Sequence, residues 1–139
     1  DVCKLSLQCG KLRASKRNYS ALVAALQTLG YSVPGFVASA VVSLGGQPIA
    51  QVAVDDLDIS PVCEHFSNIL QGALHSLDQG SWGYYEHIVI TSVEHHILLC
   101  IVGSERNAFQ VLITTREADP MESLEVMANV EGAIGSALQ

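Results

Sequence analysis

The chain has 139 residues, of which 49 % are hydrophobic and 15 % are charged, and its formal net charge is −7 at pH 7. The length fits one domain, and the high apolar content excludes an intrinsically disordered chain. So few charges also indicate that part of the apolar surface is covered by a partner, a first sign of an oligomer.

The charge is unevenly distributed along the chain. Residues 1–17 carry five Lys or Arg and one Asp, a net charge of +4, whereas residues 18–139 carry two Arg and thirteen carboxylates, a net charge of −11. We therefore divide the chain into a basic N-terminal extension, residues 1–17, and a domain, residues 18–139. The acidic domain would repel nucleic-acid phosphates and anionic membranes, so we expect no nucleic-acid partner.

The start of the chain contains an alternating pattern, because Cys3, Leu5, Leu7 and Cys9 alternate with polar residues, as in an edge strand. An ordered tail is the alternative. No apolar run is long enough to span a membrane, and the start lacks the apolar core of a signal peptide. We expect a cytoplasmic protein without membrane insertion, whose four cysteines are free thiols because no C-x-x-C occurs.

The first half of the domain predicts a helix followed by a β-hairpin. Asn18 can cap a helix whose apolar residues recur at helical spacing up to Gly30. Residues 36–43 and 48–54 then read as two strands joined at Gly45-Gly46.

A second, long helix is predicted after Asp58-Ile59-Ser60-Pro61, where a capping hydroxyl precedes a proline at the first helical position. Its apolar stripe is the strongest periodic signal in the chain, and we expect its members to be core residues. They are Val62, Phe66, Ile69, Leu70, Ala73, Leu74 and Leu77.

Three strands and a final helix complete the pattern. Residues 84–92, 95–102 and 108–116 read as an antiparallel meander with short polar turns. Asp119 and Glu122 form a capping box for a helix that runs to the end. The order α-β-β-α-β-β-β-α predicts an α+β fold: a five-stranded antiparallel sheet with one long helix on one face and the terminal helices on the other.

This order, with a helix leading into V-P-G-F-V-A-S-A-V-V-S-L-G-G-Q-P-I-A over residues 33–50, resembles the roadblock/dynein light-chain family. The resemblance covers most of residues 19–138. Gly45 stands where the family often has an acid, which leaves the turn intact. The resemblance implies a roadblock/longin/profilin-like fold and a non-catalytic, dimerising platform for small Ras-like GTPases. It also implies subunits that join edge strands into one sheet, as homodimers or with a paralogous roadblock subunit.

Histidine and cysteine spacing argues against a metal or catalytic site. His65 and His75 lie ten residues apart on one helix, about 15 Å, and His95 and His96 point to opposite faces of a strand. Cys63 and Cys100 lie among apolar residues, which favours core thiols over nucleophiles. With no phosphate-binding loop present either, we expect neither a cofactor nor a metal nor an enzyme.

The surface of the long helix opposite its apolar stripe is the predicted functional surface. Gly72 at its centre would let a second helix approach closely, since the family packs this helix against its dimer mate. The predicted dimer-interface residues are Glu64, Asn68, Gln71, Gly72, His75, Trp82 and Tyr84, and the predicted partner-binding residues are His65, His75 and Arg106.

Two other functions are compatible with the pattern. One is a small-molecule sensor lined by Trp82, Tyr84 and Tyr85, although an aromatic content of 6 % is low for such a pocket. The other is a longin-type trafficking adaptor, which shares the strand order but lacks the leading helix. If the chain stimulates GTP hydrolysis, we expect it to order the GTPase's own switch residues, because Arg106 is only a weak candidate for an arginine finger.

Overall fold

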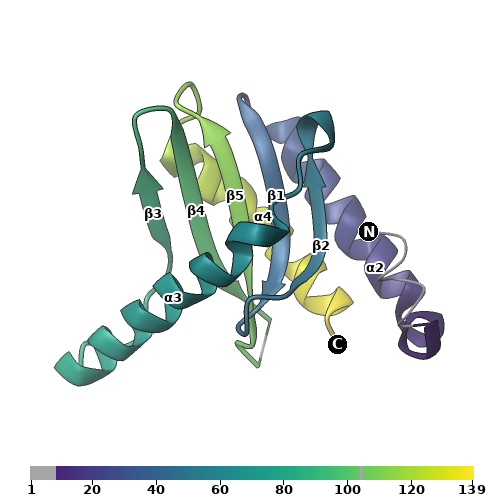
Figure 1. The fold of residues 1–139 in the computed structure, drawn as a ribbon, viewed down its shortest axis with the longest axis horizontal. Coiled ribbons are helices and arrows are strands. Elements are labelled where there is room, and N and C mark those ends of the chain that lie inside the picture. The colour runs from purple at the N-terminus through teal and green to yellow at the C-terminus, as the bar shows by residue number, and fades with distance from the viewer. Residues whose placement is uncertain (1–8, 104) are drawn as a thin grey trace.

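The computed structural model describes residues 9–103 and 105–139, with side chains from Asn18 onward. The predicted element order is confirmed (Figure 1). The elements are α2 (Cys9–Ser32), β1 (Phe36–Ser43), β2 (Pro48–Ala53), the 3₁₀ turn η1 (Val54–Asp56), α3 (Ser60–Gly80), β3 (Ile88–Thr91), β4 (His95–Val102), β5 (Ala108–Thr115) and α4 (Pro120–Ala137).

The sheet is antiparallel throughout, with the strand order β2-β1-β5-β4-β3. Helix α3 crosses one face, and α2 and α4 lie together on the other (Figure 1). The inner strand β1 carries small residues, and Ala38, Ser39 and Ala40 are fully buried. β2 and β3 form the two edges, so the arrangement of layers expected from the sequence is confirmed.

Two apolar cores form, one on each face of the sheet. The core under α2 and α4 gathers Leu26 and Leu29 with Leu98, Leu112 and other buried residues. The core under α3 gathers Cys63, Phe66 and Leu70 with β1 and β5 side chains that point the other way. The alternation of strand side chains therefore supplies both cores at once.

Several element ends differ from the predicted ones. α2 begins at Cys9, so Asn18 lies inside the helix, and its side chain donates a hydrogen bond to the Gln139 carbonyl (3.3 Å) instead of capping. Ser60 does not cap α3 with its hydroxyl. The predicted Asp119 cap is confirmed, since its carboxylate accepts from the Met121 N–H (2.9 Å). The division at residue 17 stays a prediction.

The third strand is shorter than predicted. Residues 84–87 do not pair, because the chain there places Tyr85 against the core under α3 before β3 begins at Ile88. The predicted burial of Val62 and Ile69 is also wrong, because both side chains are about 40 % exposed. The buried stripe of α3 is instead Cys63, Phe66, Ser67 and Leu70.

Phe66 and Ile69 provide a matched test of the helix orientation. Phe66→Ala removes a side chain that is 7 % exposed and should lower the free energy of unfolding by about 3–5 kcal/mol. Ile69→Ala should cost less than half as much, because the smaller Ile69 side chain is already 40 % exposed and buries less apolar surface. Urea unfolding of both variants measures the difference, and equal losses would contradict this orientation.

Candidate functional site

Helix α3 is anchored at its start by a polar network on the β2 side. The Asp58 carboxylate accepts from the Ser60 N–H (2.9 Å) and from the Gln51 amide (3.1 Å), and the Gln51 Oε1 accepts from the Ile59 N–H (3.2 Å). These hydrogen bonds, first those from Ser60, lower the pKa of Asp58 from 3.8 to about 2. The sequence analysis assigned the capping oxygen of this helix to the Ser60 hydroxyl. In the structure the Asp58 carboxylate accepts from the backbone at this end instead.

A second anchor joins the middle of α3 to the β1–β2 hairpin. The Ser67 hydroxyl and the Gln71 amide both donate to the Leu44 carbonyl, the latter at 2.7 Å. Gly46 has φ +94°, and a Cβ there would lie 2.7 Å from the Glu64 Cα. Two predicted dimer-interface residues, Glu64 and Gln71, therefore lie towards the hairpin of their own chain.

The C-terminal part of α3 extends past the edge of the sheet formed by β3 (Figure 1). Its apolar residues here, Ala73, Leu74 and Leu77, are only partly buried. Asn68, Gly72 and His75 are exposed, and a Cβ on Gly72 would meet nothing within 4 Å. This half of the helix is thus accessible to a second protein over most of its circumference.

Two apolar residues of α3 that the sequence analysis assigned to the core are exposed instead. The side chains of Val62 and Ile69 are 39 % and 40 % exposed. Their signal was present in the sequence, because the apolar residues of α3 span a wider arc than one helix can bury against one sheet.

An apolar row on the sheet lies beside α3. Ile90, Ile97 and Ile113 are register partners on β3, β4 and β5, and each is only partly buried. Figure 1 shows why: α3 crosses the sheet obliquely and leaves the ends of these strands uncovered. The row therefore adds apolar area to the accessible surface of the same face.

Aromatic residues and one arginine cluster after the end of α3. Trp82 and Tyr84 are 76 % and 78 % exposed, and the Arg106 guanidinium lies 4.8 Å from the centre of the Tyr84 ring. Burial raises the pKa of Tyr85 to about 12, and its buried hydroxyl has no hydrogen-bond partner among the described residues. The structure thus brings Arg106 together with Tyr84, while His65 and His75 lie exposed on α3.

The described residues offer little for catalysis or metal binding. Burial raises the pKa of both Cys63 and Cys100 to about 11, which disfavours the nucleophilic thiolate at neutral pH. Within residues 9–103 and 105–139, no group of three or more His, Cys, Asp or Glu is placed to hold a metal ion. No helix in this part of the chain has the length and hydropathy needed to cross a bilayer.

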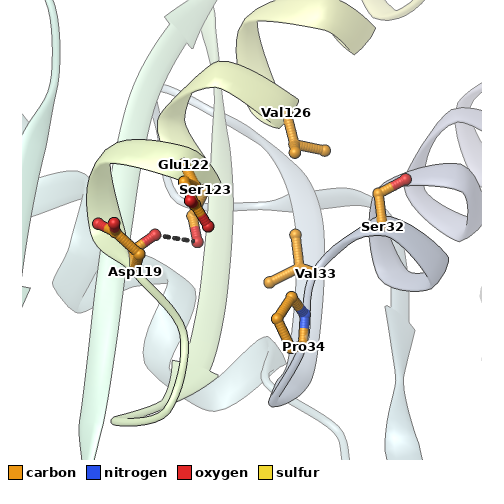
Figure 2. Close-up of a pocket in the computed structure, with 7 residues that line it drawn as sticks. All are labelled: Ser32, Val33, Pro34, Asp119, Glu122, Ser123 and Val126. Atoms are coloured by element: carbon orange, nitrogen blue, oxygen red, sulfur yellow. Dashed lines mark hydrogen bonds between the residues drawn. The ribbon is translucent and has the colours of Figure 1, made fainter.

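One small pocket lies where the end of α2 meets the start of α4 (Figure 2). Its volume is about 30 Å³, enough for roughly one water molecule. Ser123 stands in it with its hydroxyl donating to the Asp119 carbonyl (2.9 Å). Trp82, Tyr84 and Tyr85, the residues expected to line a sensor pocket, belong neither to it nor to the larger groove beside β2.

Comparison with solved structures identifies the architecture. MglB from Myxococcus xanthus superposes with a TM-score of 0.77 at 11 % identity, covering 86 % of this chain and 89 % of that one. A Roadblock/LC7 domain from Streptomyces avermitilis gives a TM-score of 0.74 at 16 % identity, covering 82 % and 94 %. A structure described as MglB with tetrameric arrangement gives 0.77 at 10 % identity, covering 86 % and 89 %.

The chain therefore has the roadblock fold expected from its sequence. No protein-family model matches the sequence, and no curated protein matches it. At these identities the similarity establishes the fold alone.

The Asp58 network generates a pH-dependent prediction. Folding lowers the pKa of Asp58 from 3.8 to about 2, so its ionised form stabilises the fold above about pH 4, and this contribution is lost as the pH falls towards 2. Asp58→Asn should therefore be less stable at neutral pH and should lose less stability between pH 4 and pH 2. Urea midpoints across this range measure both effects, and parallel pH curves for the two proteins would refute the assignment.

Gly46 and Gly45 provide a matched test of the hairpin anchor. Gly46→Ala should be destabilising by at least about 1 kcal/mol, because it combines positive φ with a clash against the α3 backbone. Gly45→Ala should stay within about 0.5 kcal/mol, because its Cβ would approach only the Ser43 hydroxyl, at 3.8 Å. Equal thermal unfolding temperatures for the two variants would show that the hairpin does not pack closely against α3 at Gly46.

Proposed function

We propose that this chain is a non-catalytic platform that dimerises through α3 and β3 and binds and regulates a small Ras-like GTPase. The observation that carries the proposal is the roadblock fold with an α3 that extends past the β3 edge and leaves Ala73, Leu74 and Leu77 only partly buried. The GTPase as partner follows from the resemblance to roadblock proteins.

Dimerisation is supported by the state of the β3 edge. Proline and charged residues usually protect an edge strand from pairing with another chain, and β3 contains neither. Val89 of β3, on the α2–α4 side of the sheet, is 37 % exposed. Antiparallel pairing of two β3 strands about a two-fold axis would extend the sheet, and the protruding half of each α3 would then lie across the partner.

The predicted contacts divide into two groups on this arrangement. Asn68, Gly72 and His75 are free to face a second α3, and Trp82 and Tyr84 flank the segment that leads into β3. Glu64 and Gln71, held near the hairpin, would contribute only at the periphery. The leading helix α2 also favours a roadblock protein over a longin-type adaptor, which lacks this helix.

GTPase binding would use the composite surface of the dimer. His65 and the exposed apolar residues Val62 and Ile69 lie on α3, and the Ile90–Ile97–Ile113 row lies beside it. A surface of this kind, apolar with few charges, is typical of the centre of a protein interface. Since Arg106 rests on the Tyr84 ring, we expect any stimulation of hydrolysis to come from ordering the GTPase's own residues.

Gly72→Glu tests the dimer interface, with Gly132→Glu as its control. Both glycines lie in helices with nothing within 4 Å of an added Cβ, so both variants should fold. Glu at position 72 would set two like charges together across the two-fold axis and should give a monomer, whereas Gly132→Glu on α4 should leave the dimer intact. Light scattering measures the mass of each variant. A monomeric unmodified chain, or a dimeric Gly72→Glu variant, would refute the interface.

GTPase binding is tested with a small Ras-like GTPase from the same genome. We expect the GTPase to co-elute with the unmodified chain in one nucleotide state and to lose binding when Gly72→Glu abolishes the dimer. Binding by the monomeric variant with unchanged affinity would separate the GTPase surface from the dimer and contradict the proposed platform.

A further inference from the structure

The β2 edge of the sheet belongs to none of the surfaces assigned so far. β2 pairs with β1 on one side, and no strand among residues 9–103 and 105–139 pairs with its other side (Figure 1). An edge of this kind presents backbone N–H and C=O groups that a second extended chain can bind. The proposed dimer uses β3, at the opposite edge, and therefore leaves β2 accessible.

An apolar groove lies beside the β2 edge, on the face of the sheet that carries α2. Its volume is about 370 Å³, and no charged residue lines it. Tyr31 of α2 and Phe36 of β1 contribute aromatic rings to the lining, and Val52 and Val54 contribute from the β2 side. Tyr31 is 90 % exposed and Val54 is 41 % exposed. Binding sites of roughly 300 Å³ already hold small ligands, so the groove has room for one large side chain.

The two faces of β2 fix which side chains of a paired strand would meet the groove. Val52 packs on the core under α2, whereas Gln51, on the opposite face, bonds Asp58. Side chains of neighbouring strands that lie opposite each other point to the same face. A residue paired with Val52 would therefore enter the groove, and its two neighbours would point away from it.

Two aspartates lie at the end of this edge. Asp55 and Asp56 directly follow Val54, and both are exposed. The nearby Asp58 carboxylate accepts two hydrogen bonds at the start of α3, but none reaches the carboxylates of Asp55 and Asp56 among the side chains that the structure describes. This end of the groove therefore carries two negative charges without a described counter-charge.

Charge favours a different protein over a second copy of this chain as the occupant. Residues 18–139 have a net charge of −11, and their two cations are engaged elsewhere: Arg106 lies on the Tyr84 ring, and Arg116 donates to the Ser92 carbonyl (2.9 Å). A second copy would bring a like-charged domain to this edge, whereas a cationic segment would complement the two aspartates. Residues 3–7, predicted above as an edge strand, lie outside the described residues, and the site does not rest on them.

We propose that the β2 edge binds an extended, basic segment of a partner protein. The segment pairs antiparallel with β2, inserts one large apolar or aromatic side chain into the groove beside Val52, and places Lys or Arg beside Asp55 and Asp56. Because the strands run in opposite directions, the basic residues come two or three positions before the groove residue, as about three residues separate Val52 from Asp55. The site depends neither on a GTPase nor on the α3 interface.

The first test uses a capped synthetic peptide, K-R-T-F-T-V-T, added to the full chain. NMR titration measures its affinity, and hydrogen exchange reports on the β2 amides from Ile49 to Ala53, with β5 amides as the reference for folding. We expect the β2 amides that point away from β1 to exchange freely in the chain alone and to become protected with the peptide. The control peptides E-E-T-F-T-V-T and K-R-T-A-T-V-T should each bind at least about tenfold more weakly.

The second test removes the two aspartates. Asp55→Asn with Asp56→Asn keeps the backbone, because Asn tolerates the positive φ of 53° and 56° at these positions. This variant should bind K-R-T-F-T-V-T at least about fivefold more weakly at low salt and should bind E-E-T-F-T-V-T more tightly than the unmodified chain does. Glu125→Gln with Glu131→Gln removes the same charge from exposed positions on α4 and should leave both affinities nearly unchanged.

Four outcomes would overturn the proposal. The peptide protects the β3 amides instead of β2, or binds neither edge; the outward β2 amides are already protected in the chain alone, which means that the edge is covered; their protection rises with chain concentration without peptide, which assigns the edge to a second copy; or the two double variants lose affinity equally. The monomeric Gly72→Glu variant should bind the peptide like the unmodified chain, so failure here is distinguishable from failure of the proposed platform.

Discussion

The structure depends on an unequal coverage of its sheet: two helices lie on one face and one on the other. Five strands spaced about 4.8 Å apart form a layer roughly 20 Å wide, whereas a helix with its side chains is about 10 Å across. α2 and α4 together can cover such a face, and their core includes fully buried residues from β1, β4 and β5. α3 alone cannot, so Ile90, Ile97 and Ile113 stay only partly buried on its side. The accessible apolar area of the molecule follows from this geometry.

The oblique course of α3 follows from its two polar anchors. Asp58 and Gln51 fix its start beside β2, and Leu44 binds Ser67 and Gln71 near its middle. With these points held on the β1–β2 hairpin, the rest of the helix has to leave the sheet on the β3 side. The hairpin therefore sets the direction in which α3 presents its free half, although it lies at the opposite edge of the sheet.

Most of the fold could be predicted from the sequence because strong local signals agree with the tertiary arrangement. The apolar runs of β4 and β5, bounded by short polar turns, identified those strands to within a residue, and Asp119-Pro120 identified the start of α4. Burial on α3 was harder to predict, because Val62 and Ile69 continue the same helical periodicity as Phe66 although the sheet does not reach them. Periodicity shows which residues lie on one side of a helix, but not how far the opposing surface extends.

Predictions of the functional surface met a similar limit. Gly72 and His75 were placed on an accessible side of α3 from spacing alone, and the structure leaves both exposed. The bonding of Gln71 to the Leu44 carbonyl depends on a contact 27 residues apart, which no local pattern reveals. The pairing of Arg106 with Tyr84 likewise needs the turn after β4 to meet the segment after α3. The contacts of such side chains can be assigned only from the folded structure.

The free half of α3 has a consequence for how the molecule forms its secondary structure. An isolated helix of ten or so residues is only marginally stable in water, because nucleation costs more than a few hydrogen bonds return. The last turns of α3, from Gln71 to Gly80, receive little packing from their own sheet and end at Ser81 in a left-handed cap. Their helicity should therefore rise when a second surface packs on them, so that helix content and association become linked equilibria governed by mass action. The helix content at the end of α3 would then rise with protein concentration, because the chains associate.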